Sequence, residues 1–155
     1  MPKEVMRHKA SDNVYLHKDF HGALSLGIDY LDQRGGLQAV RDYLRQFASA
    51  FYPPLTEALK RRGLVALKEH FERVYRTEGT EVSLRLSEDE LIVEVPRCPA
   101  VTYMRQHGHH VARLFHETTR TVNEAICEGT GFAAELVRYD EQTGASCQRF
   151  YRRQP

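Results

Sequence analysis

Two stretches decide the fold: residues 81–99, EVSLRLSEDELIVEVPRCP, and residues 132–151, FAAELVRYDEQTGASCQRFY. In the first stretch, apolar residues alternate with polar ones on both sides of a turn at 87–90. In the second, the runs 132–139 and 145–151 flank a turn over 141–144. Alternation of this kind around a polar turn is typical of a β-hairpin. The sequence therefore predicts two hairpins, and apolar residues at helical spacing predict one helix, about 109–128, between them.

The residues before 80 carry helical periodicity. Apolar residues at 3.6-residue spacing predict a helix from Asp19 that the pair Gly35-Gly36 ends, and a second helix from Leu37 to about Phe51. Pro53-Pro54 ends that helix and starts the next, since proline suits the first turn of a helix. A short helix is predicted from Leu55 to Arg62 and a further amphipathic helix from Leu64 to Gly79, with Gly63 as either a cap or a bend between them.

These elements predict one α+β domain over residues 1–155. Residues 1–16 show no clear period and are expected to form an N-terminal arm. Residues 17–79 are expected to form a helical layer. This layer packs on a four-stranded, mostly antiparallel sheet with the order strand-strand-helix-strand-strand in residues 80–155.

Composition excludes several classes of protein. The 155 residues are 41% hydrophobic and 28% charged, which is typical of a globular domain. The net charge of +1 gives no electrostatic basis for nucleic-acid binding. No apolar run is long enough for a membrane span, and the first residues lack the apolar core of a signal peptide. Three cysteines without regular spacing favour reduced thiols and a cytoplasmic location.

Cys98 is the first candidate for chemistry. It lies between Arg97 and Pro99, where the prolines end strand pairing, and a neighbouring cation stabilises a thiolate, the reactive form of cysteine. The alternative is a structural cysteine in a turn. Cys147 lies in the last strand, and its facing depends on the register. If the hairpins share one sheet, Cys98 and Cys147 approach each other and offer two thiolates to zinc or iron.

Histidines supply further candidates. His17 and His21 are spaced to share one face of a helix and could complete a metal site with the two cysteines. His116 shares a helical face with Cys127, but eleven residues separate them, about 16 Å along a helix, so they cannot exchange a proton. Cys127 is therefore predicted to be a buried packing residue. His116 and His21 remain the candidate general bases for Cys98.

Two resemblances follow from these patterns. The order of elements resembles the vinyl-reductase-type ligand-binding domain, which implies an apolar cavity for a small molecule or lipid-like group and frequent dimerisation through the helical half. The C-terminal half resembles the L-2-amino-thiazoline-4-carboxylate hydrolase-like family through Cys98-Pro99, the segment Phe115-His116-Glu117, and Cys147 followed by Phe150. That resemblance implies functional roles for both cysteines, one of them as a nucleophile on a cyclic amidine carbon.

The leading hypothesis is a cytoplasmic hydrolase-like domain for a small heterocyclic or amide substrate, with Cys98, Cys147 and His116 as catalytic residues. The first alternative is a non-enzymatic module that binds or senses a small ligand, a metal or a tetrapyrrole, and a homodimer is expected. The second alternative is an assembly subunit without a small-molecule site.

Overall fold

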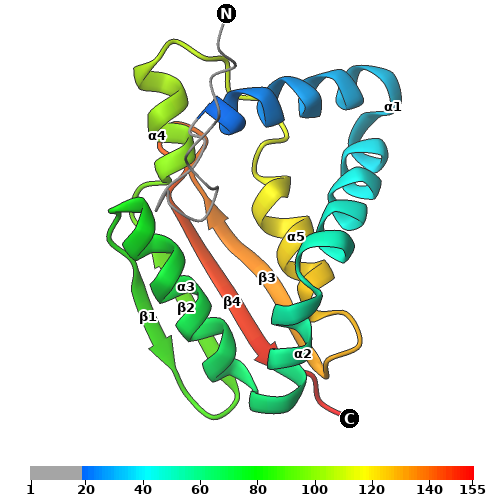
Figure 1. Ribbon diagram of the computed structural model, residues 1–155, viewed down its shortest axis with the longest axis vertical. Helices are drawn as coiled ribbons and strands as arrows, with labels where there is room; N and C mark the ends of the chain where they lie inside the picture. Colours follow the sequence, from blue (N-terminus) through cyan, green and yellow to red (C-terminus); the bar gives the residue numbers. More distant parts are fainter. Residues whose placement is uncertain (1–18) are drawn as a thin grey trace, which may run out of the picture.

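The two hairpins join in one sheet. In the computed structural model, which describes residues 19–155, the strands are β1 (Ser83–Leu86), β2 (Glu90–Val95), β3 (Phe132–Tyr139) and β4 (Ser146–Arg152). Their order is β1-β2-β4-β3, and every neighbouring pair is antiparallel (Figure 1). The predicted α+β class with a four-stranded antiparallel sheet is confirmed.

Three helices precede the sheet: α1 (Asp19–Phe51), α2 (Pro53–Arg62) and α3 (Leu64–Glu78). Gly36 has a φ of 64° and a ψ of −159°, so the helical path of α1 breaks there and the chain changes direction (Figure 1). A residue without a Cβ adopts this backbone at little steric cost. The predicted break at the glycine pair and the predicted proline boundary between α1 and α2 are both confirmed.

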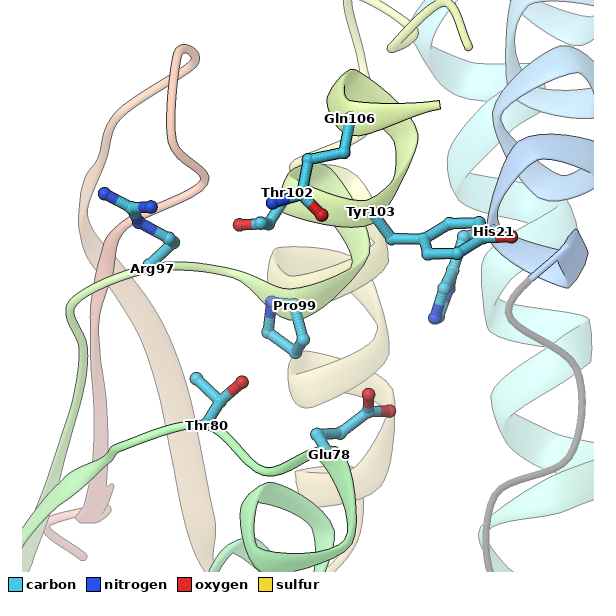
Figure 2. Close-up of a pocket in the computed structure, with 8 residues that line it drawn as sticks. All are labelled: His21, Glu78, Thr80, Arg97, Pro99, Thr102, Tyr103 and Gln106. Carbon is cyan, nitrogen blue, oxygen red and sulfur yellow. The ribbon is translucent and has the colours of Figure 1, made fainter. Parts of the chain in front are cut away.

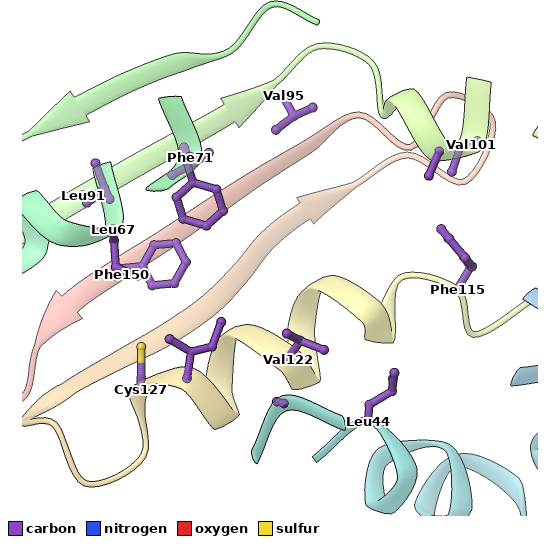
Figure 3. Close-up of a cluster of buried hydrophobic side chains, with 14 of the residues drawn as sticks. Leu44, Leu67, Phe71, Leu91, Val95, Val101, Phe115, Val122, Cys127 and Phe150 are labelled. Carbon is purple, nitrogen blue, oxygen red and sulfur yellow. The ribbon is translucent and has the colours of Figure 1, made fainter. Parts of the chain in front are cut away.

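The core lies between the sheet and two helices that cover the same face, α3 and α5 (Glu117–Cys127). Burial has a period of two along β2 and β4, so alternate side chains of both strands face the helices. The Phe150 ring is fully buried and lies 5.4 Å from the Phe71 ring of α3. Figure 3 shows these rings facing each other, with Val122 of α5 nearby. Cys127 is 1% exposed, which confirms its predicted role in packing.

The helix predicted over 109–128 is confirmed only in its second half. Residues 99–106 form a separate helix, α4 (Pro99–Gln106), and α5 begins only at Glu117. The reason lies in α1: the Ser25 hydroxyl donates to the His110 carbonyl at 2.9 Å and accepts from the Ala112 amide at 2.8 Å. These contacts, made by a fully buried serine, hold the backbone of the connection away from a helical path.

Ion pairs continue this attachment along the same stripe of α1. Asp29 lies 2.8 Å from His110 Nε2, and Asp32 lies 2.9 Å from an Arg113 nitrogen. Ser25, Asp29 and Asp32 of α1 therefore all bind the connection between α4 and α5. None of the helices in residues 19–155 combines the length with the apolar character that a membrane crossing requires.

We predict that His70 makes the fold sensitive to acid. The imidazole is partly buried between Tyr52 and Phe71, and burial lowers the pKa of His70 from 6.5 to about 4. Between those two pH values the unfolded chain binds a proton that the native state does not, so the free energy of unfolding falls as the pH falls through this window. Urea denaturation at pH 7.5 and pH 4.5 measures the loss.

The His70→Gln variant is expected to lose less stability over the same interval than the wild type. His107→Gln, which changes an exposed histidine, is the control and should retain the wild-type pH dependence. An identical loss in His70→Gln and wild type would contradict the assignment.

Candidate functional site

Cys98 occupies the N-cap position of α4, and its backbone is hydrogen-bonded to the β3–β4 turn. Its amide donates to the Thr143 carbonyl at 3.1 Å. The next residue of that turn, Gly144, has a φ of 68° and passes so close that an added Cβ would lie 2.8 Å from Val101 Cγ2 and still nearer to Cys98 Cβ. Only glycine fits both the conformation and the space. The turn therefore sets the position of Cys98.

The β3–β4 turn is itself ordered by polar contacts. The Asp140 carboxylate accepts from the amides of Gln142 and Thr143 at 2.7 and 3.0 Å, and these bonds lower the pKa of Asp140. Arg105 of α4 donates to the Gln142 and Glu141 carbonyls, both at 2.8 Å. The two contacts to α4, one at Cys98 and one at Arg105, hold the helix against the turn over most of its length.

The Cys98 thiol is in its neutral form at physiological pH. Burial raises the pKa of Cys98, and the nearby Glu78 carboxylate raises it further. Hydrogen bonds from the backbone amides of Val101 and Ala100, at the start of α4, act in the opposite direction but are outweighed. The predicted activation of this thiol by Arg97 is therefore opposed by the buried setting.

Two tyrosines that interact electrostatically with Cys98 are also neutral. Burial raises the pKa of Tyr75 on α3 and of Tyr139 on β3, and a negative charge on Cys98 would raise both further. A hydrogen bond joins Tyr75 to the side chain of Gln148, which is 3% exposed. Asn123 of α5 donates to Gln148 Oε1 at 2.8 Å. A neutral network thus connects α3, β4 and α5 beneath the thiol.

A pocket of about 200 Å³ opens beside Cys98. Its lining comes from the start of α1, the end of α3 and the residues after it, the β2–α4 connection and α4 (Figure 2). Figure 2 shows His21 next to Tyr103, Glu78 at the end of α3 with Thr80 after it, and Arg97 on the opposite side from His21. The full lining is His21, Glu78, Thr80, Arg97, Pro99, Thr102, Tyr103 and Gln106.

The pocket is lined by one cation, Arg97, one carboxylate, Glu78, and several neutral groups. Arg97 is exposed and forms no ion pair within residues 19–155. Burial lowers the pKa of His21, so its imidazole is neutral at physiological pH. Thr102 and Gln106 add uncharged hydrogen-bonding groups on the next turns of α4. Arg97 suits an anionic group of a small polar molecule, and Glu78 suits a hydrogen-bond donor or cationic group of the same molecule.

His116 lies at the start of α5 and is oriented by a buried carboxylate. Its Nε2 is 3.3 Å from Glu117 Oε1, and Glu117 is 1% exposed. Burial opposes ionisation of Glu117, but hydrogen bonds from Thr121 at 2.6 Å and Arg41 at 3.2 Å outweigh it and lower the pKa of Glu117. The carboxylate is therefore charged and fixes the imidazole.

Tyr139 is the residue that both Cys98 and His116 approach. Its ring centroid lies 5.6 Å from that of His116. A negative charge on Cys98 would raise the pKa of the Tyr139 hydroxyl. The structure thus brings two of the predicted catalytic residues to one tyrosine. Cys147 is placed elsewhere: it alternates with the buried Ser146 and Gln148, so its side chain is on the opposite face of the sheet.

The predicted metal ligands do not gather. Cys98 faces the helices, Cys147 faces away from them, and His21 lines the pocket at the start of α1. His17 lies outside the described residues. Within residues 19–155, no three side chains of His, Cys, Asp or Glu come together in a way that could hold a metal ion.

Several residues of the site were not predicted from the sequence. Tyr75, Tyr139 and Gln148 read as ordinary members of amphipathic elements, and their convergence depends on the order of the strands. Glu117 follows the predicted His116 directly, and a carboxylate in the first turn of a helix is a known stabilising feature. The position of Glu117 in the first turn of a helix, next to His116, was the signal in the sequence that could have indicated its role.

Neither a protein-family model nor a curated protein sequence matches this chain. The two resemblances drawn from the sequence therefore stay predictions, and the function is argued from the site itself.

We predict that the contact between Gly144 and Cys98 is essential to the site. Gly144→Ala places a methyl group against Cys98 and Val101, whereas Gly129→Ala, at a similar φ of 70°, meets nothing within 4 Å. Both variants carry the conformational penalty of alanine at positive φ, on the order of 1 kcal/mol. Gly144→Ala should lose about 1–3 kcal/mol more, from overpacking. Chemical denaturation measures both, and equal losses would refute the packing argument.

Thiol labelling should follow burial. At pH 7.5 we expect Cys147, on the open face of the sheet, to react first with a disulfide reagent. Cys98 and Cys127 should react much more slowly because burial raises the pKa of both thiols, that of Cys127 to about 12. Peptide mass spectrometry over time measures the order. Rapid labelling of Cys98 would show that its thiol is activated after all.

Proposed function

We propose that the protein binds a small polar molecule that carries a carboxylate, in the pocket at the start of α4. The observation that carries this proposal is that Arg97, without an ion-pair partner in residues 19–155, lines one pocket together with neutral hydrogen-bonding groups and with the Glu78 carboxylate, which suits a donor group of the same molecule. An arginine fork matches a carboxylate in geometry and charge. The volume of about 200 Å³ favours a ligand smaller than a tetrapyrrole.

Hydrolysis is the second candidate, because Cys98 lies between two residues of the pocket lining, Arg97 and Pro99. In a cyclic amidine substrate, Cys98 Sγ would add to the amidine carbon, the thiol proton would pass to the departing ring nitrogen, and water would release the product. The raised pKa of Cys98 makes this step slow at neutral pH, and its rate should increase as the pH rises. The neutral thiol is why binding is preferred to catalysis here.

The test uses two related compounds, 2-amino-thiazoline-4-carboxylate and 2-amino-thiazoline, which lacks the carboxylate. The first should raise the melting temperature of the wild type and the second should not. Arg97→Gln should weaken binding of the carboxylate about tenfold or more, since a charge-assisted hydrogen bond is lost. Arg61→Gln, an exposed arginine on α2, is the control and should bind like the wild type.

Equal stabilisation by both compounds, or an unchanged response in Arg97→Gln, would count against a carboxylate site. If neither this compound nor a set of other small carboxylates binds, the proposal fails. Product formation is followed in the same samples. Turnover by the wild type that Cys98→Ser abolishes would establish the hydrolase, and binding without turnover would leave the binding module.

A cytoplasmic location and a homodimer remain predictions from the sequence. The pocket described above is formed by one chain, so the binding test does not depend on either.

A further inference from the structure

A second hollow lies between the end of α1, α2 and the first part of α3. It has a volume of about 310 Å³ and shares no residue with the pocket at α4. Its apolar lining includes Phe51, Tyr52, Leu55, Ala58 and Ala66, and we call it the α2–α3 groove. This volume and this lining are typical of small-molecule sites in proteins.

The apolar surface of the groove is accessible. The Phe51 side chain is 66% exposed although it is large and aromatic. Its ring packs against Phe47 at 5.6 Å and against Tyr52 at 5.0 Å, so it is held in place. An exposed and fixed aromatic surface at the edge of a groove is a feature of ligand sites.

Two polar side chains in the groove have no hydrogen-bond partner within residues 19–155. These are the Tyr52 hydroxyl and the His70 imidazole, whose rings lie 6.0 Å apart. Both are partly buried, and burial raises the pKa of Tyr52 and lowers that of His70, so both are neutral at physiological pH. Each therefore offers one hydrogen-bond donor to a molecule in the groove.

The rim of the groove carries one positive charge. Arg62 is paired with Glu69 through two hydrogen bonds of 2.7 and 2.8 Å, and these two charges cancel. Arg73, the remaining charged residue of the lining, forms no ion pair within the described part of the chain. The groove is thus apolar along its length and cationic at one edge, which complements an apolar molecule with an anionic end.

We propose that the α2–α3 groove binds an apolar carboxylate of the medium-chain fatty-acid class. The alkyl chain lies along Phe51, Leu55 and Ala58, and the carboxylate meets Arg73, with hydrogen bonds from His70 and Tyr52. This site is independent of the pocket at α4, because the two have no lining residue in common.

Calorimetric titration with octanoate tests the proposal, with octanol as the matched neutral compound. The wild type should bind octanoate with an affinity in the millimolar range or better, and octanol at least tenfold more weakly. Arg73→Gln should reduce octanoate affinity about tenfold or more. Arg76→Gln, an exposed arginine on the same helix outside the groove, should leave it unchanged.

Ala58→Leu fills the groove from its solvent side and should abolish octanoate binding without loss of the fold, which circular dichroism verifies. Arg97→Gln should bind octanoate like the wild type, so failure of the pocket at α4 and failure of the groove are distinguished. No binding of octanoate by the wild type overturns the proposal. Equal affinities for octanoate and octanol, or an Arg73→Gln variant that binds like the wild type, also overturn it.

Discussion

The antiparallel pairing of β2 with β4 is the constraint on which the rest of the structure depends. Six residue pairs, from Glu90↔Tyr151 to Val95↔Ser146, join two hairpins that are separated by a long helical segment. This register places Phe150 beside Leu91 and Gln148 beside Val93 on the helix-covered face. A shift by one residue would turn every one of these side chains to the other face, so the core and the polar network exist only in this register.

Gln148 brings a polar group into the centre of that covered face, and its surroundings compensate for the cost of burial. Asn123 and Ser146 satisfy its amide, and Tyr75 joins from α3. Within residues 19–155, no buried side-chain nitrogen or oxygen lacks a hydrogen bond. Cys98 lies near this network, and burial raises the pKa of its thiol. The architecture around Cys98 therefore favours recognition of a ligand over attack on one.

Helix α1 is long enough to contribute residues to both proposed sites. Its first half fastens the connection between α4 and α5 through Ser25 and brings His21 to the pocket at α4. Its second half supplies Arg41 to the buried Glu117 and ends in Phe51 at the α2–α3 groove. The two proposed sites are thus built on opposite ends of one helix that is broken at Gly36.

Local patterns in the sequence determined the two hairpins, the glycine and proline boundaries of the helices, and the burial of Cys127. Each of these follows from interactions between residues close in the chain, such as alternation, turn chemistry and proline sterics. The position of α4 was missed because Pro99 reads equally well as the end of a strand and as the first residue of a helix. Only the tertiary structure decided the facing of Cys98 and Cys147, since facing depends on a register set by long-range pairing. The same holds for the charge state of Cys98, because burial in the folded chain, where the β3–β4 turn packs against it, raises its pKa.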